Sequence, residues 1–201
     1  MENLLAAAAG RVFDEQGWPS PSEESWRRTP LDKLLPAGFL DEAAQFKLTE
    51  TLPSQKEEWS GQTAALRGAA ARIITEGGIV REVHVAPRAA AAGLSVKWVP
   101  REKWPSDLVH CGMGELEKNA NRIVAWHWRS LAGSVLVHVP SGCNVDDCIL
   151  VEEGLENYSG NTVFIPHLHI DAEESSSVEV CWAFQGQPEG PRVSSSSRRL
   201  V

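Results

Sequence analysis

Two histidines spaced two positions apart are the residues of this chain best suited to metal chemistry. His167 and His169 alternate with Leu168 and Ile170, and acidic residues follow at Asp171, Glu173 and Glu174. Side chains two apart on a strand point to the same side, so both imidazoles can share a metal ion with a carboxylate. The apolar face of Leu168 and Ile170 leaves both histidines on the opposite, solvated side. We therefore predict a polar strand face and no metal centre, with His167 and His169 as the residues to test for one.

The same segment also resembles the first metal-binding motif of the cupins, in which His-x-His and a following glutamate bind a divalent metal inside a small β-barrel. His167, His169 and Glu173 match that motif. The glycine expected soon after the glutamate comes late, at Gly186, and no second motif with a further histidine follows. A small cupin-type metalloprotein, an isomerase or dioxygenase, is therefore the alternative interpretation of the chain. The direction in which the two histidines face distinguishes the alternatives.

The cysteines form no ligand set. Cys143 and Cys148 flank a predicted turn, Cys111 and Cys181 are remote, and no C-x-x-C pair is present. Iron–sulfur ligation needs thiolates that converge in space. We predict reduced, buried cysteines that act as small hydrophobic residues. His110 and Cys111 do not make a nucleophile and base, because neighbours on a strand point apart.

The elements that position these residues change from helix to strand along the chain. Helical spacing and caps predict helices over about 2–16, ending at Gly17, from the capping box Ser54–Glu57 through Ile73, and over about 115–130. The third helix carries Trp126 and Trp128, which face different directions, so that one can lie in the core while the other is exposed or meets a partner. For each tryptophan taken singly, core packing is the favoured interpretation. Period-two alternation predicts strands over 94–98, 134–139, 147–152, 163–170 and 177–184. These strands fit a sandwich, a barrel or a β-solenoid.

Composition divides the chain into three parts of an α+β protein. We predict a helical N-terminal region over 1–78, a β-rich core over 79–186 and a disordered tail over 187–201. The tail combines prolines and glycine with serines and arginines, and has too little apolar surface to offset the entropy of ordering.

The overall charge and hydropathy restrict the partners. Of 201 residues, 42% are hydrophobic and 23% charged, as in an ordinary globular protein. A net charge of −8 argues against nucleic acid or an anionic membrane as the main partner. No run approaches the roughly 18 apolar residues of a membrane span, and no basic residue precedes the first apolar run as in a signal peptide. We expect a cytoplasmic protein.

The most specific pattern is residues 17–34, GWPSPSEESWRRTPLDKL. Pro19 and Pro21 fix the backbone of a loop, Glu23 opens a short helix, and Trp18 and Trp26 anchor the loop on the domain. This segment looks like the N-terminal signature of the SufD branch of the SufB/SufD family of iron–sulfur cluster assembly proteins. Two later segments, 131–152 and 163–186, are similar to turns of that family's right-handed parallel β-helix.

The resemblance implies a helical N-terminal segment followed by a SufB/SufD-type solenoid, mainly β in the second half. Proteins of the SufD branch pair with SufB-type proteins through their β-helices and dock the SufC-type ATPase through a C-terminal helical region. They form a scaffold for nascent clusters and catalyse no step alone. The chain ends earlier than family members do, so it looks truncated at the C-terminus, and the histidine and cysteine of cluster chemistry lie beyond its end. We transfer no catalytic, cofactor-binding or metal-binding residue, and expect an iron–sulfur cluster only in the assembly complex.

An early end has a physical consequence. A solenoid buries its core turn against turn, so its last turn needs a cap. Without one, the strand around 178–184 offers apolar side chains and unpaired backbone groups to another strand. We expect the chain to self-associate through this β edge or to bind a partner there.

Overall fold

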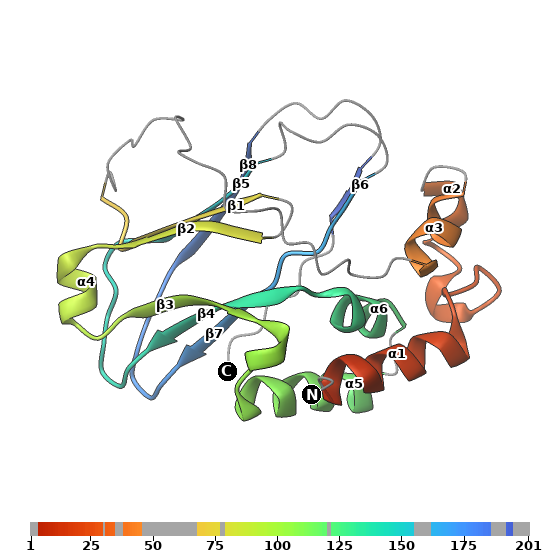
Figure 1. Ribbon diagram of the computed structural model, residues 1–201, viewed down its shortest axis with the longest axis horizontal. Coiled ribbons are helices and arrows are strands. Elements are labelled where there is room, and N and C mark those ends of the chain that lie inside the picture. Colours follow the sequence, from red (N-terminus) through yellow and green to blue (C-terminus); the bar gives the residue numbers. More distant parts are fainter. Residues whose placement is uncertain are drawn as a thin grey trace.

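The computed structural model describes residues 4–29, 31–34, 38–45, 68–76, 79–119, 122–154, 162–185 and 192–194. Within them the chain is an α+β molecule, with helices packed on one side of two small mixed sheets (Figure 1). The predicted capping box at Ser54 and Glu57 lies outside the described residues. None of the described helices is both long and apolar enough to cross a membrane.

The N-terminal helix follows its sequence closely. Helix α1 (Leu4–Gln16) buries one stripe formed by Leu5, Ala9 and Phe13. It ends where predicted, at Gly17, because this residue adopts a φ of +64° and its N–H donates to the carbonyl oxygen of Phe13. Short helices follow: η1 (Glu24–Trp26), α2 (Leu31–Leu34) and α3 (Phe39–Gln45).

The later helices differ from the prediction. The single helix predicted over 115–130 is wrong, since the structure has two, α5 (Ser106–Asn119) and α6 (Arg122–Ser130). Helix α1 lies along α6 and also touches α5 (Figure 1). Two further short helices are α4 (Pro87–Ala91) and η2 (Arg101–Lys103).

The strands form three sheets. One has the order β2-β1-β5-β8, the second β3-β4-β7, and the third pairs β6 with β9. Their bounds are β1 (Ala71–Glu76), β2 (Ile79–Val85), β3 (Ser95–Pro100), β4 (Gly133–Val139), β5 (Ile149–Gly154), β6 (Thr162–Phe164), β7 (Leu168–Ala172), β8 (Val180–Gln185) and β9 (Arg192–Ser194).

Two predicted boundaries between elements are wrong. The predicted second helix does not reach Ile73, because Ile73 lies in β1, where it pairs with Val83 of β2 and Val151 of β5. Pairing on both sides outweighs the helical spacing of the alanines before it. Strand β9 lies inside the tail predicted to be disordered; the rest of that tail is outside the described residues. The strands predicted over 94–98, 134–139, 147–152 and 177–184 are confirmed with small shifts at their ends. The single strand predicted over 163–170 is wrong, because this segment is divided between β6 and β7, which lie in different sheets.

The chain passes through the three sheets twice in the same order. It runs β4, β5, β6 and then β7, β8, β9, and each later strand lies parallel to its earlier counterpart. The registers place Val135 beside Leu168 and Ile149 beside Val180. A further parallel bridge joins Asn144 to Ser177 between the strands. Strands β2 and β3, in contrast, are antiparallel to their neighbours β1 and β4.

Strand β4 separates two clusters of buried residues. Its Leu136 belongs to the helical core, whose other members come mainly from α1, α3, α5 and α6. Its Val135, Val137 and Val139 face the β core, which lies between the two larger sheets. Both faces of β4 are therefore buried, one by helices and the other by strands.

Candidate functional site

The last strands of each sheet form the candidate interaction site, here called the C-terminal edge (β7, β8 and β9). Among the described residues, each of these strands is paired on one side only. An edge strand presents backbone N–H and C=O groups that a further strand can pair with. The three edges come from consecutive segments of the chain, so together they can accept one further set of strands.

Burial falls off toward this edge. In β4 and β5, the core-facing residues Val137, Val139 and Val151 are at most 1% exposed. One strand further out, Val180 and Trp182 of β8 pack against the same core but are only partly buried. Strand β8 thus buries the core residues of β5, while its own side chains are only partly buried by the described residues.

The described side chains of β8 carry no charge that would discourage pairing. From Val180 to Ala183 the strand reads Val-Cys-Trp-Ala, and Cys181 is exposed. Natural edge strands commonly carry lysine, proline or an inward charge against association. Their absence from this part of β8 favours pairing with another strand.

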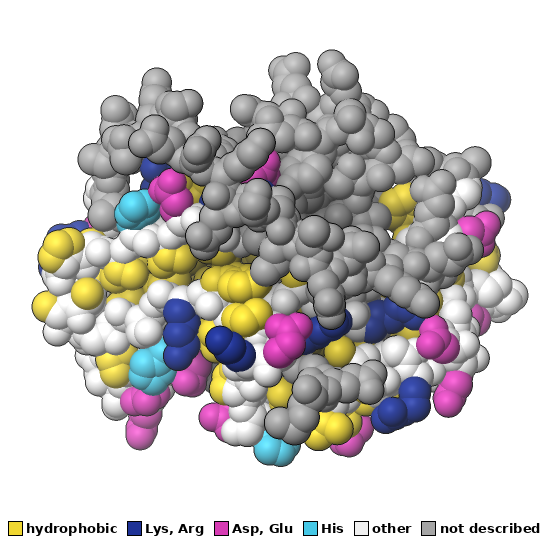
Figure 2. All heavy atoms as spheres, in the orientation of Figure 1, with side chains coloured by type: hydrophobic (Ala, Val, Ile, Leu, Met, Phe, Trp, Pro, Cys, Tyr) yellow, Lys and Arg dark blue, Asp and Glu magenta, His cyan; other side chains and the backbone are white. Residues whose placement is uncertain are grey.

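The opposite side of the stack, the N-terminal edge (β2 and β3), is also partly apolar. Figure 2 shows hydrophobic side chains gathered over β2, β3 and α4. Four side chains of these two strands, Val83, Val85, Val96 and Trp98, are partly buried against the β core. Because β2 and β3 run antiparallel to their neighbours, this edge does not continue the parallel order of the C-terminal edge.

The predicted solvated face of the two histidines is wrong for His167. Leu168 and Ile170 do point into the β core, as predicted. His167, on the other side, is only 7% exposed because helix α6 covers it. Its ring lies 4.5 Å from the ring of Trp128, and its Nδ1 atom is 3.1 Å from Nε2 of His127. His169 is partly buried.

Burial dominates the electrostatics of this pair. Desolvation lowers the pKa of His127 to about 4. Desolvation also lowers the pKa of His167 well below its usual value, and the positive charges of His127 and His169 add to this. Both imidazoles are therefore neutral at physiological pH. One of the two facing nitrogens donates its hydrogen to the other.

The third residue of the cupin-type set is engaged elsewhere. Glu173 accepts a hydrogen bond from the backbone N–H of Ser141 and lies 3.7 Å from Nε2 of His138. His138 also contacts Asp171 at 3.0 Å. The part of the chain that the structure describes contains no group of three His, Cys, Asp or Glu side chains able to hold a metal ion.

The cysteines occupy four different environments. Cys143 is buried in the β core, as predicted, and Cys111 and Cys148 are partly buried. Cys181 is exposed, so the prediction that it is buried is wrong. The reason is its place on the outer strand β8, where it points away from the core that Val180 and Trp182 contact. None of the four forms a disulfide bond.

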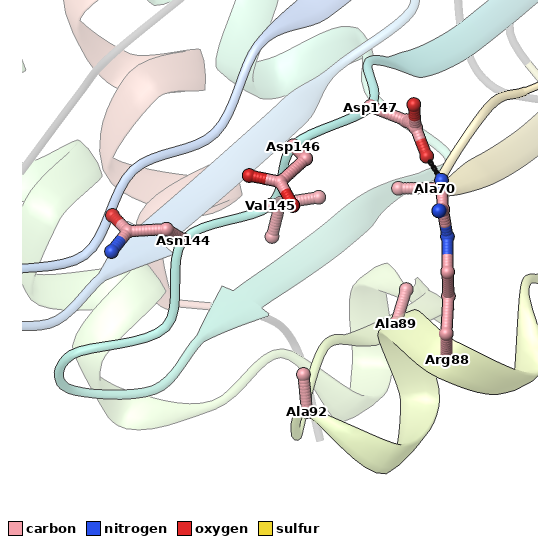
Figure 3. Close-up of a pocket in the computed structure, with 8 residues that line it drawn as sticks. All are labelled: Ala70, Arg88, Ala89, Ala92, Asn144, Val145, Asp146 and Asp147. Atoms are coloured by element: carbon pink, nitrogen blue, oxygen red, sulfur yellow. Dashed lines mark ion pairs between the residues drawn. The ribbon is translucent and has the colours of Figure 1, made fainter.

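A small pocket lies between α4 and the segment that leads into β5 (Figure 3). It has a volume of about 180 Å³ and a mixed lining, with four apolar residues (Ala70, Ala89, Ala92 and Val145) and four polar ones (Arg88, Asn144, Asp146 and Asp147). Arg88 forms an ion pair with Asp147. With its arginine paired in this way, the lining indicates no particular ligand.

The signature segment is fixed to the helical core through Trp18. The indole packs on Phe13 and Trp126, with ring centroids 4.9 and 5.3 Å away, and its Nε1 donates to the carbonyl oxygen of Leu40 at 2.8 Å. The prediction that Trp18 anchors the loop is confirmed. Trp26 is only partly buried, in η1.

Arg122 of α6 holds the same loop. No pattern in the sequence indicates this residue. Its Nη1 atom donates to the carbonyl oxygens of Gln16 and Trp18 at 3.0 and 3.2 Å, and Nη2 forms an ion pair with Glu23. Glu23 also accepts a hydrogen bond from the Ser20 N–H. That backbone bond, followed by Arg122, lowers the pKa of the Glu23 carboxyl.

The tryptophans of α6 are both buried, as the favoured interpretation of core packing for each predicts, and neither is the exposed member that the helical spacing allows. Trp126 and Trp128 are each 2% exposed. The reason is that α6 is covered on several sides: Trp126 donates to the carbonyl oxygen of Ala43 in α3, and Trp128 donates to Glu115 of α5. Helical spacing alone cannot indicate cover from two directions.

Comparison of the chain with models of known protein families gives no match, and comparison with curated protein sequences gives none either.

Proposed function

We propose that this chain is a SufD-like scaffold component of the cytoplasmic machinery that assembles iron–sulfur clusters. It acts through contacts with SufB-type and SufC-type proteins and catalyses no step alone. The cluster is the cargo of the assembled complex and is not held by this chain. The proposal combines the signature at residues 17–34 with the arrangement of the strands.

The repeated parallel strand order is the observation that carries this proposal. A β-helix brings the chain back to the same sheets once per turn, with every strand parallel to its counterpart. The pairs β4 with β7, β5 with β8, and β6 with β9 follow that rule. Each strand pairs with one roughly 30 residues later, within the repeat length of about 20–45 residues that solenoids use. We therefore take these strands as two turns of a SufB/SufD-type β-helix.

The position of the signature segment supports the same assignment. The Pro-broken loop after α1 packs against α6, directly before the first strand of the repeat, through Trp18 and Arg122. A loop that joins the N-terminal helices to the start of the β-helix explains why its prolines and tryptophan are spaced so specifically.

The proposed mechanism is edge pairing. The C-terminal edge offers backbone groups from three parallel strands and apolar side chains that are only partly covered. A SufB-type β-helix brings strands with the same spacing, so main-chain hydrogen bonds join the two and side chains close the end of the β core. A second copy of this chain competes for the same edge.

Co-purification with SufB-type and SufC-type proteins tests the proposal. A matched pair of substitutions locates the contact: Cys181→Lys adds a charge at the C-terminal edge, and Ser95→Lys adds one at the N-terminal edge, both at exposed positions. We expect association with the original chain and with Ser95→Lys, and its loss with Cys181→Lys. Failure of the original chain to associate with folded partners contradicts the function. Loss with Ser95→Lys alone contradicts the assigned edge.

A further inference from the structure

The imidazoles of His127 and His167 meet at the boundary between the two cores. His127 comes from α6 in the helical layer, and His167 immediately precedes β7. They are 3% and 7% exposed, and their facing nitrogens are 3.1 Å apart. The other ring nitrogen of His167, Nε2, is buried without a hydrogen-bond partner. The ring of Trp128 contacts both imidazoles, and Trp104 packs on Trp128.

Protonation changes this contact in two distinct steps. The neutral pair shares one hydrogen, with one nitrogen as donor and the other as acceptor. A first added proton keeps that bond but places a positive charge in an apolar boundary. A second added proton puts two N–H donors against each other and removes the bond. Neither charged state is compatible with close packing of α6 on the strands.

Other charged groups near the boundary are committed elsewhere. From α5, Glu115 accepts the indole N–H of Trp128. From η2, Arg101 donates to the carbonyl oxygen of Arg129, and Arg129 on α6 pairs with Asp14. From β7, His169 faces the pair and adds positive charge when it is protonated. The surroundings therefore oppose protonation of the pair.

The strand stack holds a buried titratable group of a different kind, Glu153 of β5, which is 0% exposed and accepts a hydrogen bond from Oγ1 of Thr75. A proton makes a carboxylate neutral, whereas it places a positive charge on a buried imidazole. Mild acid therefore charges the contact between the helical layer and the strands without placing a charge inside the strand stack.

We propose that the His127–His167 contact is an acid-sensitive lock, which holds the helical layer (α1, α5 and α6) on strands β4 and β7 when both rings are neutral and releases it when they are protonated. The released state keeps the strand stack and its β core. This inference does not depend on the proposed function.

The size of the effect follows from burial. When the helical layer is released, the pKa of His127 rises from about 4 to the ordinary value of 6.5. By proton linkage this favours release by about 20-fold or more at about pH 5 relative to neutral pH, from His127 alone. His167 shifts in the same direction and adds to it.

Amide hydrogen exchange of the full chain, corrected for the intrinsic effect of pH, tests the lock. We expect protection in α1 and α6 to fall by about 20-fold or more between neutral pH and about pH 5, while β4 and β5 keep theirs. In a His127→Gln, His167→Gln double variant, which retains hydrogen bonding but cannot titrate, this fall should disappear. His110→Gln, on an exposed position of α5, is the matched control and should behave like the original chain.

Three results overturn the lock: unchanged protection of α1 and α6 at about pH 5, an equal loss in α1, α6, β4 and β5, or the same pH response in the double variant. The first and second need only the original chain, so they stand even where the double variant does not fold.

Discussion

The helical core and the β core meet at β4 but are built from different side chains. The helical core contains Trp104, Trp126 and Trp128, packed with leucines and phenylalanines. The β core is composed of small and β-branched residues arranged in register along paired strands. Polar groups are buried beside the helical core, including the histidine pair, and the indoles of Trp126 and Trp128 donate hydrogen bonds to the carbonyl oxygen of Ala43 and to Glu115.

This difference shows two ways of specifying a fold. In the helical core, Trp126 and Trp128 each have one fitting position, because the indole N–H meets an acceptor while the ring faces are packed. In the β core, backbone pairing sets the position, and one small apolar residue resembles the next. Substitutions of the large rings in the helical core should therefore lower the free energy of unfolding strongly. In the β core, the loss in free energy of unfolding should become smaller as the substituted residue lies closer to the C-terminal edge.

The largest effect is expected for Trp128→Ala. The ring is 2% exposed and contacts Trp104, His167 and Glu115. Its removal should lower the free energy of unfolding by about 3–5 kcal/mol, through lost burial and a cavity. Urea unfolding followed by circular dichroism measures this. Trp98→Ala, at a partly buried position of β3, is the control and should cost less; equal losses would contradict the contrast between the cores.

The next effect is a loss of stability in acid that originates in the helical core. The folded pKa of His127, about 4, lies below the ordinary 6.5, so the unfolded chain takes up the proton first as the pH falls. The contribution of this residue is complete above pH 6.5, is lost as the pH falls toward about 4, and amounts to about 3 kcal/mol.

Urea unfolding at a series of pH values measures this contribution. His127→Gln should flatten the profile between about pH 6.5 and 4. His127→Asn, which likewise cannot take up a proton, is the second variant and should flatten the profile in the same way. A profile that is the same in His127→Gln and the original chain would show that the pair carries no such cost.

In both cores, the sequence predicts local features better than it predicts which distant residues bury a given side chain. Gly17 ends α1, and alternation separates Leu168 and Ile170 from His167, because these signals depend only on the chain's own neighbours. The solvation of His167 is mispredicted because its cover, His127, comes from 40 positions earlier. His127 lies at helical spacing from Ile123, Val124 and Leu131, and this pattern is the available signal of its burial.

The prediction of a helix through Ile73, where the structure has strand β1, is wrong for a related reason. Ala71 and Ile73 fit the spacing of a helix as well as that of a strand, and the choice is made by β2 and β5 on either side. Arg122 is likewise invisible to pattern analysis, since its partners are backbone carbonyls more than a hundred positions away. Burial by residues distant in the sequence and hydrogen bonds to backbone carbonyls produce no periodic pattern in the sequence.

A third, smaller effect should separate the inside of the β core from its edge. Val137→Ala, at a position 1% exposed in β4, should cost about 2 kcal/mol. Val180→Ala makes the same change on the outer strand β8, where the side chain is only partly buried, and should cost clearly less. Thermal or urea unfolding compares the two. Equal costs would mean that the C-terminal edge is fully covered, which contradicts its assignment as an open interaction site.

The smallest effect is expected where the helical core holds the signature loop. Arg122→Gln removes the ion pair with Glu23 and the bonds to the carbonyl oxygens of Gln16 and Trp18. The arginine side chain is 15% exposed, so the loss should be about 1–2 kcal/mol. The loop should also open, because Trp18 alone then anchors it, and tryptic cleavage after Arg28 should become faster. Arg27→Gln breaks an exposed pair with Glu24 and should change stability little. If Arg122→Gln leaves both stability and cleavage as they are, the loop is held by its prolines and Trp18, and the guanidinium of α6 has no part in fixing it.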